Sequence, residues 1–443
     1  MAITIQQYPT RAPQLDWVHQ STYPEYYTCT STNSSYSDFR YLFKFYTEDG
    51  LVSNSKNPPY ITDELGVYDA TPVLQEYLYY EVDPEIVTYY APPGAIQNYL
   101  IKATEFSDSI GSPSTSNFQK TIALNCHQED WDYTQYRLDG NTKKFLSKLD
   151  TDQTLELGLN EPATLRCLAG MLRPNYTSER SLLYEFIVTV TDAVDGYIRY
   201  YIFNTANPYY AETTANGPST SNTTIEDLSH WVLEIPVGPK NINQMTWRYV
   251  GINSGGTYWN LGNSNLVSGN IVDVDDTYYV EGYTWPTGGD GRTSQKYYYK
   301  VVDYCSNQDP ILLCWENELG GTDYFSFTQV NAKNQGIERS VFRQVRDSIG
   351  VNRDNWMGHN DYDRGLTNYY NNITTTYFLN SDWLENPEWT YLEDLWLSKN
   401  VFAMIDDTWY PVVLSVDNML IETTAKGLRQ YSFEIILSNK RYV

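Results

Sequence analysis

The sequence predicts a mainly β protein, built as multi-domain antiparallel β-sandwich-like modules with a few short α-helices. Many short segments alternate apolar and polar residues, which is the period of a half-buried strand. Only two segments carry a helical apolar stripe behind a helix start signal. The 443 residues also include 42 Tyr and 12 Trp, whose large rings favour strand faces and protein interfaces.

The N-terminal part begins its clear strand pattern at residues 39–47, FRYLFKFYT. Four aromatic residues alternate with polar ones there, so one face of this strand is expected to be buried. They are Phe39, Tyr41, Phe43 and Phe45. Further along, Thr71 is expected to cap a short helix whose first residue is Pro72. Residues 95–106 and 120–126 predict two more strands.

The central part contains the clearest hairpin pattern, with strands at 182–191 and 197–205 around the turn DAVDG. The polar stretch 207–224 is typical of a long surface loop, and WVLEIPVGP (231–239) resumes β structure. Residues 253–295 alternate Gly, Asn and Ser clusters with short aromatic runs, which predicts short strands and long turns.

In the C-terminal part, residues 296–305 are expected to pair with 311–317, and residues 309–328 to form a hairpin. Its turn holds Gly320 and Gly321, where the chain needs a positive φ or a close backbone approach. The inward-packing residues of this hairpin are predicted to be Leu312, Cys314 and Phe325, with Trp315 on the face opposite Cys314.

A second helix is predicted at 386–399, with Asn386 as its cap and Pro387 as its opening residue. Five large apolar residues are expected on its buried side. They are Trp389, Leu392, Leu395, Trp396 and Leu397. Strands follow at 401–407, 409–416 and 430–439. These patterns divide the chain into an N-terminal β module with one helix (1–125), a central β domain with long loops (126–300) and a C-terminal β domain with one helix (301–443).

The formal net charge of −25, from 55 acidic and 30 basic residues, repels phosphate backbones and anionic headgroups. We therefore expect no direct nucleic-acid binding and no membrane partner. The N-terminus has no basic and apolar signal pattern, and no apolar run is long enough to span a bilayer. Five widely spaced cysteines without a C-x-x-C pattern indicate reduced residues of a protein folded in a cytoplasm.

Motifs for catalysis are missing from the sequence, so we expect no enzyme, no catalytic residues and no cofactor. None of the four histidines lies in H-E-x-x-H, and G-x-S-x-G does not occur. Cys314 has the pattern of a buried strand cysteine rather than a nucleophile. Adjacent Cys126 and His127 would point to opposite strand faces and are unsuited to one zinc ion.

Two acidic clusters, DVDD (273–276) and DYDRG (361–365), offer oxygen ligands of the kind that calcium prefers. The second has Gly365 where a calcium-binding loop needs Asp or Asn, and it lacks the closing Glu. Both are therefore interpreted as turn residues, and no metal site is expected. The enzymatic alternative is glycan cleavage, which needs two carboxylates and an aromatic cleft, but no spacing singles out such a pair.

Several motifs together are unusual: CSNQDPILLCWENELGGTDYFSF (305–327), DRGLTNYYNNITTTYFLNSDWL (363–384), a Trp- and Leu-rich helix, and the strands WYPVVLSV and QYSFEIILSNK. In these the chain resembles a family of virion structural proteins of tailed bacteriophages, notably phages of Bacteroidetes and marine hosts. FRYLFKFYTEDG and GVYDATPVLQEYL resemble the opening strand-and-helix module of that family. The resemblance implies a β-rich component of the tail, neck or baseplate, with no catalytic residues to carry over.

The expected function is thus structural: a virion component, assembled in the host bacterial cytoplasm, whose partners are copies of itself and other phage virion proteins. The tyrosine surplus fits extensive subunit contacts. One alternative is a receptor-binding or glycan-degrading tail protein acting on host surface polysaccharide. A carbohydrate-binding module of a bacterial surface is a third alternative, which the missing signal pattern disfavours.

Overall fold

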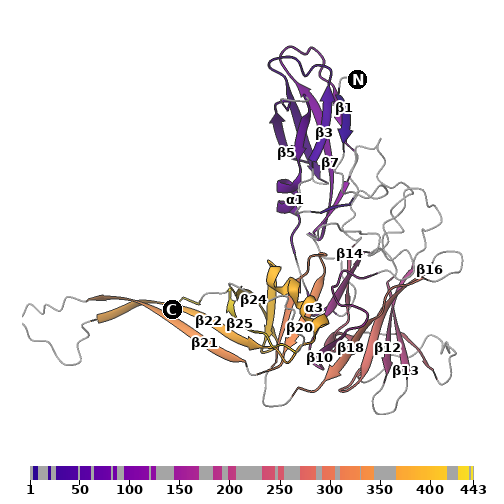
Figure 1. The fold of residues 1–443 in the computed structure, drawn as a ribbon, viewed down its shortest axis with the longest axis vertical. Coiled ribbons are helices and arrows are strands. Elements are labelled where there is room, and N and C mark those ends of the chain that lie inside the picture. Colours follow the sequence, from indigo (N-terminus) through magenta and orange to yellow (C-terminus); the bar gives the residue numbers. More distant parts are fainter. Residues whose placement is uncertain are drawn as a thin grey trace, which may run out of the picture. The chain divides into compact units, whose positions relative to one another are not determined.

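The structure is a computed structural model, and it is mainly β, with several antiparallel sheets and three short helices in the part of the chain that it describes (Figure 1). It describes residues 3–7, 18–20, 26–47, 50–60, 64–80, 83–86, 94–118, 121–125, 144–168, 183–191, 198–205, 232–244, 248–253, 270–285, 292–304, 310–329, 331–343, 366–416, 428–438 and 441–442. The predicted fold class is therefore confirmed.

The chain forms two compact units. The first comprises Met1–Asp303 and Trp315–Phe325, and the second comprises Tyr304–Cys314 and Ser326–Val443. The tip of the hairpin at 309–328 thus belongs with the first unit, although it lies beyond residue 303 in sequence. The three-part division drawn from the sequence stays a prediction.

Two sheets in the N-terminal part enclose one core. The smaller sheet has the order β1 (Ile3–Gln7), β3 (Tyr26–Ser31), β6 (Gly66–Asp69). The larger has the order β2 (Val18–Gln20), β9 (Thr121–Leu124), β7 (Ile96–Phe106), β4 (Arg40–Thr47), β5 (Gly50–Asn57), with β8 (Thr115–Asn117) paired to β7. Side chains from both sheets join a single hydrophobic cluster, as in a β-sandwich.

The strand pattern at 39–47 is confirmed, because its four aromatic side chains are all fully buried. Phe45 stacks on Tyr99 of β7, and Tyr27 of β3 packs edge-on against the same ring. The hydroxyls of Tyr27 and Tyr99 share a hydrogen bond of 2.6 Å. Tyrosine thus fills this core with its ring while its polar tip finds a partner inside.

The central part is built on a seven-stranded sheet and a two-stranded one. The path of the larger sheet is β10 (Thr154–Gly158), β18 (Tyr297–Val302), β16 (Thr277–Trp285), β12 (Leu183–Thr191), β13 (Ile198–Thr205), β15 (Arg248–Asn253), with β17 (Arg292–Thr293) beside β16. The predicted hairpin is confirmed as β12 and β13, which pair antiparallel. The smaller sheet pairs β11 (Thr164–Leu168) with β14 (Val232–Pro236).

The C-terminal sheet has eight strands. Its path is β20 (Thr322–Phe327), β19 (Ile311–Glu316), β23 (Val401–Ile405), β24 (Thr408–Ser415), β25 (Ser432–Leu437), β22 (Leu366–Asn380), β21 (Ala332–Arg343), with β26 (Arg441–Tyr442) beside β22. The predicted pairing of 296–305 with 311–317 is wrong. β18 pairs with β10 and β16, whereas β19 lies between β20 and β23, because non-local partners offered these strands better-matched faces than the neighbour in sequence.

Both predicted helices exist, but each begins at a different residue from the one expected. In α1 (Thr71–Tyr77), Thr71 is already helical, and its backbone N–H donates to the Asp69 carboxylate at 2.9 Å. In α3 (Asn386–Leu397), the N-cap is Glu385, whose backbone N–H donates to Glu388 at 2.7 Å. In both helices an acidic residue, Asp69 or Glu385, lies one or two residues before the expected cap, and the helix begins one residue earlier than predicted.

The apolar side of α3 is confirmed except at its last residue. Trp389, Leu392 and Leu395 are buried, and Trp396 packs against Phe433, but Leu397 is 62% exposed. A third helix, α2 (Pro239–Gln244), was not predicted. Its six residues are too few to show a helical stripe in the sequence.

Candidate functional site

The tip of the β19–β20 hairpin is the part of the chain that most suggested an active site. β19 is buried along its whole length, so Cys314 and Trp315 are both fully buried although they point to opposite faces. Leu312 is also fully buried, as predicted, whereas Phe325 is half-buried. This tip is occupied by protein on both faces.

Asn317 holds the turn between the two strands. Its backbone N–H donates to the Gly321 carbonyl at 3.1 Å, and its side-chain Oδ1 accepts from the N–H groups of Leu319 and Gly321 at 3.0 and 2.9 Å. Gly320 has a φ of 79°, which a side chain would strain. One buried asparagine therefore satisfies three polar groups of this turn, two through its side chain and one through its backbone.

Gly321 meets a second segment of the chain at very short range. A Cβ built on Gly321 would lie 1.6 Å from the carbonyl oxygen of Leu146. The same carbonyl accepts a hydrogen bond of 3.0 Å from the Asn317 amide, and Leu146 N–H donates to the Arg166 carbonyl at 2.8 Å. The two predicted roles of the glycine pair are thus both present, positive φ at Gly320 and close approach at Gly321.

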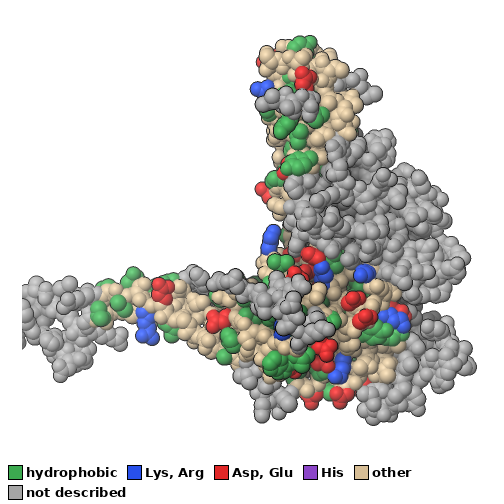
Figure 2. All heavy atoms as spheres, viewed as in Figure 1, with side chains coloured by type: hydrophobic (Ala, Val, Ile, Leu, Met, Phe, Trp, Pro, Cys, Tyr) green, Lys and Arg blue, Asp and Glu red, His purple; other side chains and the backbone are tan. Residues whose placement is uncertain are grey.

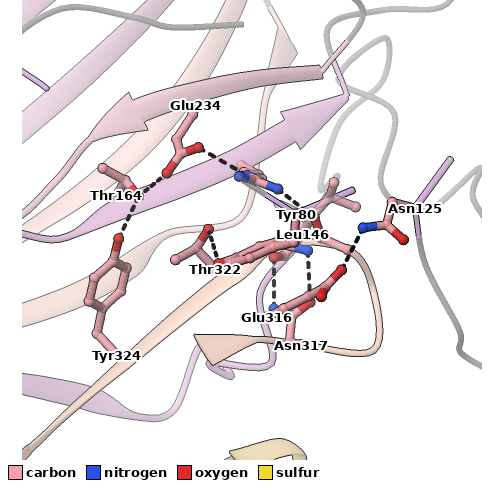
Figure 3. Close-up of polar contacts among 12 residues, drawn as sticks. Tyr80, Asn125, Leu146, Thr164, Glu234, Glu316, Asn317, Thr322 and Tyr324 are labelled. Atoms are coloured by element: carbon pink, nitrogen blue, oxygen red, sulfur yellow. Dashed lines mark hydrogen bonds and ion pairs between the residues drawn. The ribbon is translucent and has the colours of Figure 1, made fainter. Parts of the chain in front are cut away.

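A buried ion pair lies beside this turn (Figure 3). Arg166 and Glu234 occupy paired positions of β11 and β14, and Arg166 Nε donates to Glu234 Oε2 at 3.0 Å. Both side chains are fully buried. Arg166 Nη1 also donates to the Gly320 carbonyl at 3.3 Å, so the ion pair is tied directly to the hairpin turn.

Four hydroxyl groups, from two threonines and two tyrosines, complete the surroundings of this ion pair. The Thr164 hydroxyl donates to Glu234 and lies 2.7 Å from the Tyr324 hydroxyl. The Arg166 guanidinium lies over the Tyr80 ring, 4.6 Å from its centre, and the Tyr80 hydroxyl donates to Thr322 at 3.1 Å. Figure 3 shows Thr164, Glu234, Thr322 and Tyr324, which come from β11, β14 and β20, together with Tyr80. We call this set of residues, with the turn, the hairpin hub.

The charge of Arg166 is stabilised by its neighbours. Burial is the largest single influence and disfavours the guanidinium cation, but Glu234, Tyr80 and Glu316 together outweigh it, so the pKa of Arg166 is raised above its ordinary value. The arginine is therefore a permanent buried cation, fixed between acidic and aromatic groups. Its role is to hold the strands together.

Asp323 is the titratable group of the hub. Its carboxylate accepts from the Ser147 hydroxyl at 2.5 Å, the Asn317 amide at 2.8 Å and the Lys148 N–H at 3.2 Å. Burial raises the pKa of Asp323 to about 6, and these hydrogen bonds offset only part of the effect. This carboxyl group changes its protonation near neutral pH in a place that solvent hardly reaches.

The two acids of β19 and the turn, Glu316 and Glu318, also have structural partners. Glu316 is buried and accepts a hydrogen bond of 2.7 Å from the Asn125 amide. Glu318 forms an ion pair with Lys148. The carboxylates of the hub are thus engaged by the protein itself, and the glycan-cleavage alternative needs a different pair.

The DVDD cluster (273–276) forms a turn, as interpreted from the sequence. Asp273 N–H donates to the Asp276 carboxylate at 2.9 Å, and the Asp273 carboxylate accepts from the Asn270 amide at the same distance. Asp275 has a φ of 69°, which aspartate tolerates in turns. Among the described residues, no group of three His, Cys, Asp or Glu side chains is placed to hold a metal ion.

Several candidates from the sequence lie outside the described residues. They are Cys126, His127, Cys305, His230, His359, the loop 207–224 and the DYDRG cluster (361–365). The cysteines that the structure describes, Cys29, Cys167 and Cys314, are buried and form no disulfide bond. Burial raises the pKa of Cys29 to about 12, so its thiol stays protonated and unreactive.

Sequence reasoning missed the residues that build the hub, above all Arg166 and Glu234. The available signal was a charged residue at the centre of two apolar strand patterns, TLRCL and VLEIP. Opposite charges at such positions indicate a buried cross-strand pair, but only if the two strands are neighbours. Nothing in the sequence shows that β11 pairs with β14 across more than 60 residues.

No protein-family model and no curated protein matches the chain. Among solved structures, the chain is similar to extracellular domains 3–5 of Drosophila OTK, with 8% sequence identity over 85% of this chain and 93% of that one, at a TM-score of 0.18. A score this low carries no argument about fold or function. No described helix is long and apolar enough to cross a membrane.

Proposed function

We propose that the chain is a structural component of a bacteriophage virion, in the tail, neck or baseplate. In this proposal it has no catalytic role, assembles as a homo-oligomer and contacts neighbouring virion proteins. The observation that carries the non-catalytic part is the burial of the hairpin hub. Cys314 and the carboxylates of Glu234, Glu316 and Asp323 are buried, and the three carboxylates accept hydrogen bonds from the protein itself.

The virion part of the proposal rests on the resemblance of 305–327 and 363–384 to phage structural proteins. In the structure, the L-G-G and D-x-F-x-F portions of the first motif supply the turn and the buried faces of β19 and β20. In the N-S-D-W-L portion of the second, Ser381 and Leu384 are buried while Trp383 is 61% exposed. The motifs therefore consist of fold-determining residues together with one large exposed ring, which suits a building block.

The same proposal places the chain in the virion after assembly in the host bacterial cytoplasm, with no nucleic acid or membrane as partner. The net charge of −25 supports this, because it disfavours both polyanionic DNA and anionic lipid. The three described cysteines support it too, because side chains that form no disulfide bond suit a reducing compartment.

A receptor-binding or glycan-degrading tail protein is the second candidate function. It is favoured by exposed aromatic side chains, because sugar rings stack on such surfaces. Tyr60, Tyr369 and Trp383 are 63%, 68% and 61% exposed. Both candidates are components of the phage particle. In the first the exposed aromatic rings contact other virion proteins, and in the second they contact host polysaccharide.

Immunogold labelling and peptide mass spectrometry of purified phage particles test the proposal. We expect the chain in every particle, in many copies, and a repeated labelled position. Its presence in infected-cell lysate but not in purified particles would refute the virion assignment. Incubation of the purified chain with host surface polysaccharide tests the second candidate, since released oligosaccharide would overturn the non-catalytic part.

A further inference from the structure

The strands β21 and β22 form a long two-stranded ribbon in the second unit (Figure 1). β21 has 12 residues and is about 40 Å long at the usual rise per residue. β25 pairs only with Thr376–Asn380 of β22, and β26 pairs only with Asn372 and Ile373. In the described part of the chain, the outer ribbon, residues 337–343 and 366–371, therefore has no strand neighbour other than its own partner strand.

One face of the outer ribbon is apolar and basic. Alternation along β21 places Ile337, Arg339 and Val341 on the same face, and Lys333 precedes them there. The opposite face carries the acidic Glu338 and the aromatic Phe342. Leu366 pairs with position 343 and so extends the first face. Ile337, Val341 and Leu366 are 49%, 52% and 66% exposed.

A β-bulge shapes the end of this ribbon. The register shifts between Ser340 and Val341, which leaves Tyr369 without an opposite residue. Tyr369 is 68% exposed and packs edge-on against Phe342, with ring centres 5.9 Å apart. Bulges twist a strand and redirect a side chain, so this one places an aromatic pair on the face opposite to Ile337, Arg339 and Val341.

Such a ribbon requires a partner to be stable. A two-stranded hairpin is at best marginally stable alone in water, and exposed apolar patches mark contact sites. The charged residues along β21 oppose strand-to-strand pairing at its edge. The contact is therefore expected through the face of the ribbon rather than through its backbone edge. Figure 2 shows hydrophobic and charged side chains along the surface of this ribbon.

Charge identifies the partner. The strands β21 and β22 contain three basic residues and one acidic residue, whereas the remainder of the chain contains 27 basic and 54 acidic residues. The ribbon thus has a net charge of +2 on a chain that is otherwise −27. A ribbon of this charge is attracted to the acidic surface of another copy, while two acidic bodies repel each other.

The second unit also offers a complementary surface at the start of α3. Asp382 and Glu385 are exposed there, Glu388 follows within one helical turn, and no basic residue lies between them. The exposed ring of Trp383 lies among these acids. We call Asp382, Trp383, Glu385 and Glu388 the acidic corner. The carboxylates of the acidic corner can pair with Arg339 of the ribbon face. The Trp383 ring can pack against the aliphatic side chains of Ile337 and Val341.

We propose that the apolar and basic face of the β21–β22 ribbon docks on the acidic corner of a second copy of the chain. The contact joins two different surfaces, so it repeats from copy to copy and produces a ring or a stack. This inference rests on the proposed homo-oligomeric function and specifies its contact surface.

Sedimentation of the full chain over a concentration series tests the inference. We expect Ile337→Ser/Val341→Ser and Arg339→Glu each to weaken self-association at least about tenfold. Asp382→Lys is expected to weaken it similarly, and the double variant Arg339→Glu/Asp382→Lys to restore it, because the opposite charges then face each other again. The matched controls are Val413→Ser, an exposed valine of β24, and Lys399→Glu, an exposed base beyond α3.

The outcomes separate the inference from the proposed function. If the ribbon variants associate like the wild type, the ribbon is not the contact, although the homo-oligomer stands. If the double variant stays as weak as the single ones, the acidic corner is the wrong partner. A wild-type chain that stays monomeric yet is found in purified particles overturns the inference and the homo-oligomeric part of the proposed function, and leaves the virion assignment standing. A chain missing from particles overturns the virion function, whatever its self-association.

Discussion

Arg166 and Glu234 form a buried ion pair that joins β11 to β14. Removing two ions from water costs several kcal/mol each, and only good geometry with further hydrogen bonds offsets this. The pair has both, because Thr164 donates to Glu234 and the Gly320 carbonyl accepts from Arg166. Each partner therefore depends strongly on the other.

Replacing Arg166 with methionine is expected to lower the free energy of unfolding by about 3–5 kcal/mol, because the Glu234 carboxylate stays buried without its cation. Urea denaturation followed by circular dichroism measures this. The double variant Arg166→Met/Glu234→Leu should lose much less than the sum of the two single variants. Additive losses would contradict the assignment of a directly coupled pair.

Asp323 makes stability depend on pH. Its folded-state pKa of about 6 lies above the ordinary value of 3.8, so the folded protein binds the proton more tightly than the unfolded chain does. The contribution of this group is most favourable below about pH 4 and is lost as the pH rises to about 6. Two units of pKa correspond to about 3 kcal/mol.

The variant Asp323→Asn isolates this contribution. Its amide can donate to the Ser147 hydroxyl while its oxygen accepts from Asn317 and Lys148, so all three hydrogen bonds have a partner. We expect the melting temperature of the variant to exceed that of the wild type at pH 8 and the difference to shrink toward pH 4. An equal difference at both pH values would contradict the raised pKa.

Gly321 is restricted by space. Replacing Gly321 with valine is expected to cost more than about 3 kcal/mol or to prevent folding, because the new Cβ would overlap the Leu146 carbonyl oxygen. The soluble yield and the thermal unfolding temperature measure this. Gly111→Val is the matched control, since a Cβ there meets nothing within 4 Å. Normal folding of Gly321→Val would show that the turn can move away from Leu146.

At the scale of elements, short-range signals located most segments, while their ends depended on neighbouring polar groups. The period-two pattern identified β4 and β7, and the helical stripe identified α3. The predicted helix starts were wrong because Thr71 and Asn386 were chosen for the general preference of Thr and Asn for cap positions. In the structure, the backbone N–H groups at these helix starts donate instead to the carboxylates of Asp69 and Glu388. The sequence alone does not decide between such neighbouring candidates.

The start of α3 gives a direct test of this correction. Glu388→Ala is expected to destabilise the second unit by about 1 kcal/mol, because the Glu385 N–H loses its acceptor. Asn386→Ala, at the residue first expected to be the cap, should change stability by less than half of that. Thermal unfolding of both variants decides, and the reverse order of effects would restore Asn386 as the cap.

At the scale of the whole molecule, charge is distributed unevenly along the chain. The segment 332–380 is almost neutral while the rest is strongly acidic. General acidity keeps copies apart in solution, and a ribbon free of that acidity provides one place where they attract. Assembly through the β21–β22 ribbon can thus be selective although the acidic remainder of each copy repels that of the next.

The sequence by itself determined the fold class, the positions of strands such as β4, β7, β12 and β13, the buried aromatic face of β4 and the two roles of the glycine pair. These depend on alternation and on backbone conformation, which are local properties. Only the tertiary structure decided that β19 pairs with β23 instead of β18, that Arg166 meets Glu234, and that the outer ribbon has no further strand beside it among the described residues. Strand pairing between distant segments depends on the fit of whole faces and on loop closure, and a single sequence shows neither of them.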